Sequence, residues 1–407
     1  MSNEEKSGLK QWIPAFVLMI CVVLAFFDKI SIAVLFADPG FQDAMGIAED
    51  KAKLGWLMTS FLLAYGFSSV FLSFLGDIFN PMKMLLWSVF SWGVLMVFMG
   101  FTDHYGTMLF FRVLLGIAEG PLFALAYSIV KQTYTEKQQA RASTMFLLGT
   151  PLGAFLGFPI TAYVLDHFNW HATFLVMAFL TMFVLMAVIF GLSNLSLKRT
   201  IDLEHGTKRT NFIGHVQNSR KLLTNVPFWL VCIFNIALMT YLWGLNSWVP
   251  SYLIQDKGFN LKEFGTYSSF PFIAMLAGEI VGAFLSDKLG RRSIQVFLGL
   301  LFAGIFMYAM VVLTEPHMII AAMSLSAMSW GFGVAAVFAL LAKVTTADVG
   351  ATAGGIFNGL ANFASAIAPV LIGYIVMQTH SFNLGITFLA VVAVLGSFFL
   401  VPLLKRY

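Results

Sequence analysis

Long apolar runs alternate with short polar or Gly- and Pro-containing segments along nearly the whole chain. A helix of about 20 apolar residues covers the ~30 Å hydrocarbon core of a bilayer. The runs reach this length, so the pattern predicts an all-α membrane protein with twelve membrane-spanning helices. The expected spans are about 12–36, 54–76, 82–102, 105–130, 142–166, 170–194, 226–252, 262–286, 293–313, 317–342, 350–378 and 382–404.

One long polar segment, "LSLKRTIDLEHGTKRTNFIGHVQNSRKLL", lies near the middle of the chain. It predicts an N-terminal six-helix half at 1–194, a linker at 195–224 and a C-terminal six-helix half at 225–407. An internal repeat supports two pseudo-symmetric halves, because "SFLGDIFNPMK" and "AFLSDKLGRRS" align Asp77 with Asp287 at an offset of 210 residues. Many secondary transporters are built from such halves, with the substrate site at mid-membrane between them.

Composition and charge distribution narrow the class further. The 407 residues are 59% hydrophobic and only 11% charged, which excludes an ordinary soluble domain. The net charge of +4 is spread over short interhelical loops, so we expect no nucleic-acid partner. Eighteen of the 24 lysines and arginines fall on the side of the N-terminus, which predicts a multi-pass protein with both termini in the cytoplasm.

Four stretches carry a resemblance to a known family: "FFDKISIAV", "FRVLLGIAEGPLF", "NWHATFLV" and "GGIFNGLANFASAIAPVLIGYI". Together with the repeated loop, they resemble the major facilitator superfamily and, within it, the anion:cation symporter family, which includes bacterial sugar-acid carriers. The resemblance implies a proton-coupled importer of a small organic anion, such as a sugar acid or another carboxylate. It also implies an inner-membrane transporter that is not an enzyme, with the anion, protons and the lipid bilayer as partners. The sequence contains no phosphate-binding loop and no nucleophile motif, so we expect no cofactor or metal, and we expect function as a monomer.

Four charged residues fall inside predicted spans, where each charge costs roughly 2.5–3.5 kcal/mol. Asp28 and Lys29 lie in the first span, and Arg112 and Glu119 lie two helical turns apart on one face of the fourth. Their charges cancel, so an entering anion would favour protonation of a carboxyl, and proton and anion would help each other bind.

These four residues receive separate roles. The family resemblance points to Asp28 and Glu119 as the residues that couple transport to protons, and we expect Lys29 to contact the substrate and Arg112 to be the charge partner of Glu119. The alternative is that the four side chains only neutralise one another across helices.

Three further polar residues are candidates for substrate binding. Tyr65 matches a substrate-contacting tyrosine of the family, although tyrosines also serve in packing. Asn358 and Asn362 lie four residues apart on one helix face, where amides could bind substrate hydroxyls or join helices. Phe26 and Thr150 stand where sugar-acid carriers often have polar side chains, which favours a substrate with fewer hydroxyls than an aldonate.

The repeated loop supplies candidate gating residues. The resemblance assigns Asp77, Asp287, Arg291 and Arg292 to a gate on the cytoplasmic side, while the two arginines could instead only set topology. The role of Glu279, a further carboxylate within a span, stays open. An organophosphate or anion exchanger, or a proton-driven efflux carrier of the same superfamily, is the alternative function.

Overall fold

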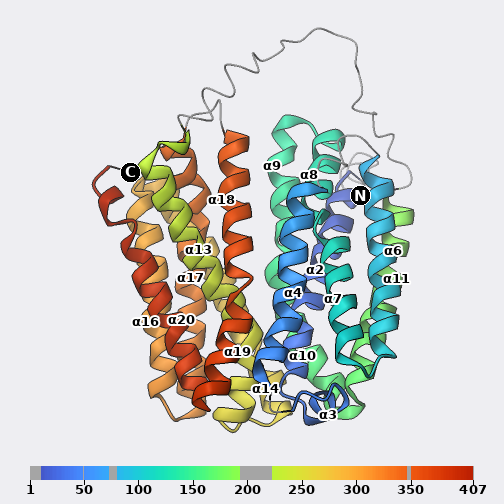
Figure 1. Cartoon of the computed structure of the whole chain (residues 1–407). Helices are drawn as coiled ribbons and strands as arrows, with labels where there is room; N and C mark the ends of the chain where they lie inside the picture. Colours follow the sequence, from blue (N-terminus) through green and yellow to red (C-terminus); the bar gives the residue numbers. More distant parts are fainter. Residues whose placement is uncertain (1–10, 49, 73–79, 193–221, 346–349, 407) are drawn as a thin grey trace, which may run out of the picture. The chain divides into compact units, whose positions relative to one another are not determined.

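The computed structural model describes residues 11–48, 50–72, 80–192, 222–345 and 350–406. These residues form helices joined by short connections, and no strand occurs among them (Figure 1). The prediction of an all-α protein is therefore confirmed for the part of the chain that is described.

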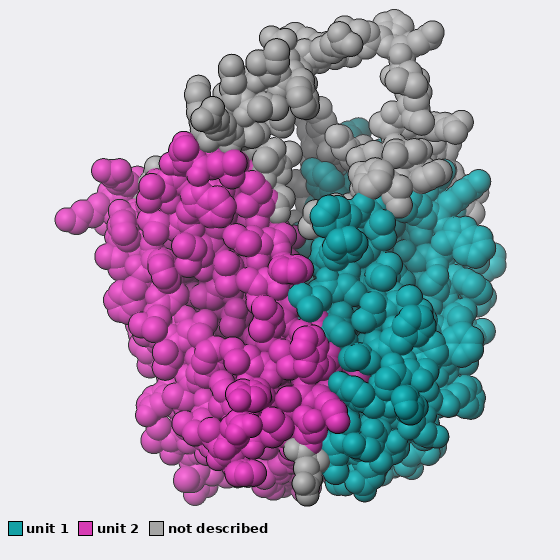
Figure 2. Space-filling model, viewed as in Figure 1, with its two compact units in different colours: residues 1–48, 60–203 teal, residues 49–59, 204–407 magenta. Residues whose placement is uncertain are grey.

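The chain divides into two compact units, which Figure 2 shows in different colours. Unit 1 comprises residues 1–48 and 60–203, and unit 2 comprises residues 49–59 and 204–407. The predicted linker, 195–224, falls mostly on residues 193–221, which lie outside the described residues. The predicted boundaries of the two halves stay a prediction.

Unit 1 is organised around its first helix. Its helices are α2 (Ile13–Leu35), α3 (Pro39–Ala44), the second part of α4 (Lys51–Phe71), α6 (Pro81–Gly100), α7 (Tyr105–Glu119), α8 (Leu122–Thr133), α9 (Glu136–Leu147), α10 (Gly149–His167) and α11 (Trp170–Leu192). Helix α2 packs against α10 and α11, and α6 packs against α11 and α7.

Unit 2 is organised around α13 and α17. Its elements are the first part of α4, α13 (Val226–Ser251), the π-helical η1 (Tyr252–Asp256), α14 (Leu261–Tyr267), α15 (Phe270–Leu289), α16 (Arg292–Val312), α17 (Pro316–Val344), α18 (Gly350–Ser365), α19 (Ala368–Thr379), α20 (Phe382–Phe398) and the short 3₁₀ helix η3 (Val401–Leu403). Helices α15 and α16 both pack on α17, while α13 packs on α18 and α20.

Eleven helical segments of the described residues are long and apolar enough to cross a membrane. They correspond to every expected span except 54–76, so the prediction of twelve is one more than the described residues provide. The remaining span coincides with α4, which has 21 residues and ends just before the undescribed segment 73–79. The chain is a multi-pass membrane protein.

Four of the expected spans are each divided in two, whereas the sequence predicts such a break only at Pro121, in the fourth span. The breaks lie between α7 and α8, α9 and α10, α14 and α15, and α18 and α19. A proline stands at the start of each second helix, namely Pro121, Pro151, Pro271 and Pro369. Proline has no backbone N–H and clashes with the preceding turn, so it begins a helix well and interrupts a longer one.

Glycines on α10 hold α2 at short range. A Cβ at Gly149 would lie 2.6 Å from the Met19 carbonyl oxygen, and one at Gly157 would lie 2.8 Å from the Ile30 side chain. Gly153 lies midway between these two glycines, and small residues at such four-residue spacing let membrane helices approach closely. The Thr161 hydroxyl of α10 also donates a 2.8 Å hydrogen bond to Ser31 of α2, which fixes the register of this pair.

Helix α7 meets the second part of α4 through a similar contact. A Cβ at Gly116 would overlap the Phe61 carbonyl oxygen, and one at Gly120 would lie 2.7 Å from the Tyr65 carbonyl oxygen. The Ile117 carbonyl, four residues before Pro121, cannot receive an N–H from that proline. The Ser68 hydroxyl of α4 donates a 2.6 Å hydrogen bond to this carbonyl and replaces the missing backbone donor.

We expect Gly116→Ala to lower the stability of the protein by about 1–3 kcal/mol, because the added methyl group overlaps backbone atoms of α4. The measurement is the apparent Tm of purified protein in detergent. Gly66→Ala on α4 is the matched control, since a Cβ there meets no atom within 4 Å. An unchanged Tm for Gly116→Ala would contradict the close α4–α7 contact.

Candidate functional site

Helices α2 and α7 place four charged side chains in the interior of unit 1. Asp28 and Lys29 of α2 and Arg112 and Glu119 of α7 are each at most 1% exposed. Ionisable groups at such depth are rare in membrane proteins and mark substrate or proton pathways. The sequence pattern had identified these four residues, and the structure brings the two pairs into one unit.

The ammonium group of Lys29 lies between a carboxylate and aromatic rings. Its Nζ is 3.7 Å from Oε2 of Glu119. The same Nζ lies 3.9 Å from the ring centre of Tyr65, 4.7 Å from that of Phe26 and 6.0 Å from that of Phe123. Aromatic faces attract cations most strongly where water is excluded, so these rings help to retain the charge of Lys29 inside the protein.

Arg112 is held by a parallel arrangement. Its guanidinium carbon lies 4.4 Å from the ring centre of Phe61. Phe61 and Tyr65 stack on each other, with ring centres 6.0 Å apart, because they are four residues apart on α4. Two neighbouring rings of α4 therefore cover the two buried cations, one ring for each.

The carboxyl groups are less well satisfied than the cations. Both oxygens of Asp28 and both oxygens of Glu119 are buried and accept no hydrogen bond from the described residues. A buried carboxylate without donors carries a large desolvation cost, which protonation removes. The cluster can therefore exchange a proton, or accept a ligand that supplies a charge or a donor.

Two of the predicted substrate-binding residues belong to unit 2. Asn358 and Asn362 lie on α18, where the Asn362 amide donates to the backbone oxygen and to Oδ1 of Asn358, each at 3.0 Å. This pairing orients both amides on one helix face, and their binding role stays a prediction. Glu279 is a half-buried carboxylate on α15 that makes no hydrogen bond with the described residues.

The predicted gating residues are only partly visible. Asp77 lies outside the described residues, and Asp287 lies in the last turn of α15 with a side chain that is not described. Arg291 is the exposed residue that precedes α16, and Arg292 donates a 3.2 Å hydrogen bond to the Ala339 carbonyl of α17. Their gating role stays a prediction.

Sequence reasoning missed the rings of Phe61 and Phe123. Their positions contain the signal, because Phe61 precedes Tyr65 by four residues and Phe123 follows Glu119 by four. Phe61 therefore shares a helix face with Tyr65, while Phe123 lies one turn beyond Glu119, across the break at Pro121. In a chain with 43 phenylalanines, this spacing alone does not distinguish a site from ordinary packing.

Buried, mutually compensating charges in a multi-pass helical protein are typical of membrane transporters. A family model described as Major Facilitator Superfamily matches residues 18–369 and, in a second match, residues 263–407. The chain belongs to this superfamily, as its sequence resemblance indicated, and the members of this family are transporters, not enzymes.

Several transporters are similar to this chain along nearly their whole length. The probable galactarate/D-glucarate transporter GarP of Escherichia coli K12 is 24% identical, over 99% of this chain and 98% of that protein. The probable sulfoacetate transporter SauU of Cupriavidus necator is 25% identical, over 95% and 93% of the two chains. The D-galactonate transporter of Escherichia coli O6:H1 is 23% identical, over 97% and 96%.

Solved structures agree on the fold. A bacterial homolog of the human lysosomal transporter Spinster, in an inward-facing and unoccupied conformation, superposes with a TM-score of 0.82 over 97% of each chain. The sequence identity is 16%, so this likeness concerns the fold alone.

We expect Lys29→Gln to lower stability by about 3–5 kcal/mol, because it leaves the Glu119 carboxylate buried without its ion pair. The double variant Lys29→Gln/Glu119→Gln should lose less than the sum of the single variants. Thermal unfolding of the four proteins in detergent measures this coupling. Lys53→Gln, which breaks an exposed pair with Asp50, should have a much smaller effect, and strictly additive losses would show that Lys29 and Glu119 do not interact.

Proposed function

We propose that the chain is a secondary transporter that moves a small organic anion together with a proton. The observation that carries the proposal is the buried cluster of α2 and α7, in which two cations face two carboxyl groups without hydrogen-bond donors. The names of the similar transporters, which refer to sugar acids and sulfoacetate, support an organic anion as substrate.

Charge balance connects the anion to the proton. With both carboxyls ionised, the charges of Asp28 and Glu119 cancel those of Lys29 and Arg112. An anion that approaches Lys29 makes the cluster net negative, and a proton on one carboxyl restores neutrality. Because each ligand improves binding of the other by the same factor, a proton gradient can drive accumulation of the anion.

The individual roles follow from the contacts. Lys29 is the proposed anion contact, since protonation of Glu119 weakens its ion pair and frees the ammonium group for the substrate. Glu119 and Asp28 are the proposed proton carriers, and Arg112 compensates their charge from its place on Phe61. The rings of Tyr65, Phe26 and Phe123 around Lys29 offer one hydroxyl, so we expect a compact anion with few hydroxyl groups.

Topology and direction belong to the same proposal. The excess of lysine and arginine on the side of the N-terminus supports cytoplasmic termini in a bacterial inner membrane. Proton coupling in that orientation makes the carrier an importer. Thermal-shift measurements with galactarate, D-galactonate, sulfoacetate and benzoate identify a ligand, because a compound that binds the folded state raises its Tm. No shift with any organic acid, together with no uptake in proteoliposomes, would refute the proposed function.

We expect Glu119→Gln to abolish gradient-driven accumulation of the acid identified in this way, while retaining binding and counterflow exchange. The amide imitates the protonated carboxyl, so it accepts the anion but cannot release a proton. Uptake of the labelled acid is measured in proteoliposomes with an imposed pH gradient, and counterflow with unlabelled acid inside at equal pH. Glu315→Gln, which changes an exposed carboxylate, is the control, and accumulation by Glu119→Gln would remove Glu119 as the coupling residue.

We also expect Lys29→Arg to retain more transport than Lys29→Gln. Arginine preserves the positive charge next to Glu119 but changes its geometry, whereas glutamine removes the charge. The measurement is the initial rate of gradient-driven uptake at equal amounts of inserted protein. Equal loss in the two variants would indicate that steric fit, and not charge, determines the role of Lys29.

A further inference from the structure

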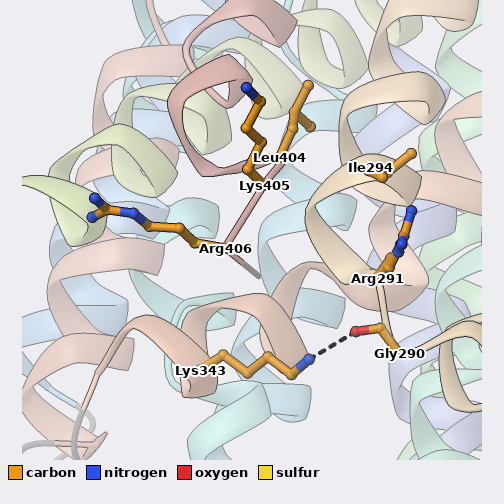
Figure 3. A pocket seen from close by; sticks show the side chains of 7 residues that line it. All are labelled: Gly290, Arg291, Ile294, Lys343, Leu404, Lys405 and Arg406. Carbon is orange, nitrogen blue, oxygen red and sulfur yellow. Dashed lines mark hydrogen bonds between the residues drawn. The ribbon is translucent and has the colours of Figure 1, made fainter.

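A basic pocket lies at the end of unit 2 that carries the C-terminus. It has a volume of about 610 Å³ and is lined by the connection from α15 to α16, the end of α17 and the segment after η3 (Figure 3). Four of its lining residues are cationic: Arg291, Lys343, Lys405 and Arg406. No acidic side chain belongs to the described lining, so the pocket is suited to an anion.

Local structure adds to this positive charge. Lys343 donates a 2.8 Å hydrogen bond to the Gly290 carbonyl, which anchors one cation beside the pocket. Arg291 and Ile294 line the pocket at the N-terminus of α16, so the positive end of that helix dipole lies beside the pocket. Among the described residues, no carboxylate pairs with Arg291, Lys405 or Arg406.

The pocket lies at the ends of two helical segments that are long and apolar enough to cross a membrane, residues 292–312 and 382–403. The ends of such segments are expected at the level of the lipid headgroups. Basic side chains in this position attract anionic lipid. Ile294 of α16 and Leu404, which follows η3, also line the pocket, so part of its wall is apolar.

An apolar groove of about 310 Å³ lies deeper on the same pair of helices. It is lined by Ile305 and Tyr308 of α16 and by Val391 and Leu395 of α20, among others. These four side chains are 45–60% exposed, as expected for a surface that faces lipid.

The pocket and the groove share one face of α16. Ile294 and Ile305 are 11 residues apart, which is close to three turns and about 16 Å along the helix axis. That length is about half of the ~30 Å hydrocarbon core, the depth that one acyl chain occupies. Between the two sites, Phe297 of α16 contacts Phe398 of α20 at a ring separation of 5.8 Å, which keeps the connecting surface apolar.

We propose that the basic pocket and the groove together form a binding site for one anionic phospholipid. The phosphate of the headgroup lies among Arg291, Lys405 and Arg406, and one acyl chain follows the groove between α16 and α20. The site is separate from the charge cluster of unit 1 and does not depend on the proposed transport function.

A groove in unit 1 provides a contrast. It has a volume of about 490 Å³ and is lined by apolar residues of α6 and α11, including Phe90, Val94 and Phe179. None of its described lining residues is charged. Apolar shape alone therefore occurs elsewhere on the protein, and the four cations distinguish the site of unit 2 as one for an anionic lipid.

The test is titration of the delipidated full-length protein with dioleoyl phosphatidylglycerol or dioleoyl phosphatidylcholine, with bound lipid counted by native mass spectrometry. We expect saturable binding of one phosphatidylglycerol molecule and much weaker binding of phosphatidylcholine. Lys405→Gln/Arg406→Gln should weaken phosphatidylglycerol binding about 30-fold, because each basic side chain near the headgroup contributes to it. Lys53→Gln/Lys262→Gln removes the same charge outside the pocket and should leave binding unchanged.

Two further arms separate the lipid from a free phosphate. Val391→Trp, which fills the groove, should weaken binding of the long-chain lipid, whereas Val94→Trp in the groove of unit 1 should not. Inorganic phosphate and glycerol 1-phosphate should neither bind measurably nor displace the lipid. Equal binding of the two lipids, unchanged binding by Lys405→Gln/Arg406→Gln or by Val391→Trp, or displacement by inorganic phosphate would overturn the proposal.

Discussion

The central constraint on this protein is the need to satisfy four charges inside a membrane-spanning unit. Water is absent from the hydrocarbon region, so each charge must find its compensation within the protein. Lys29 meets Glu119 across the contact between α2 and α7, and the rings of α4 cover both cations. The glycines of α10 and α7 serve the same purpose, because they bring α2 and α4 close enough for these short contacts.

The two carboxyl groups of the cluster lack hydrogen-bond donors among the described residues, and a carrier needs such unsatisfied groups in order to bind a proton or a ligand. A cluster with every oxygen hydrogen-bonded would hold its charges permanently and would gain nothing from a ligand. The Asp28 oxygens have no donor among the described residues, and Glu119 has one ion pair at 3.7 Å and no hydrogen bond. Protonation of these carboxyl groups, or a ligand that supplies a donor, would therefore stabilise the cluster.

The sequence revealed those features that depend on composition and spacing along one helix. Spans of 20 apolar residues, the pair Arg112 and Glu119 on one face, and the interruption at Pro121 all follow from local rules. The arrangement of Phe61 over Arg112 depends on contact between α4 and α7, which no spacing within one helix specifies. The prolines at 151, 271 and 369 carried the same local signal as Pro121, but the apolar runs around them suggested continuous helices.

Ser68 and Pro121 depend on each other through one hydrogen bond, the bond from the Ser68 hydroxyl to the Ile117 carbonyl. Proline deprives the Ile117 carbonyl of its intrahelical donor, and the serine hydroxyl of α4 replaces that donor. Proline without serine leaves a bare carbonyl next to Glu119, whereas serine without proline offers a hydroxyl to a carbonyl that is already occupied. Across related carriers, natural selection should therefore act on the two positions jointly, and the loss of one residue should be followed by drift at the other.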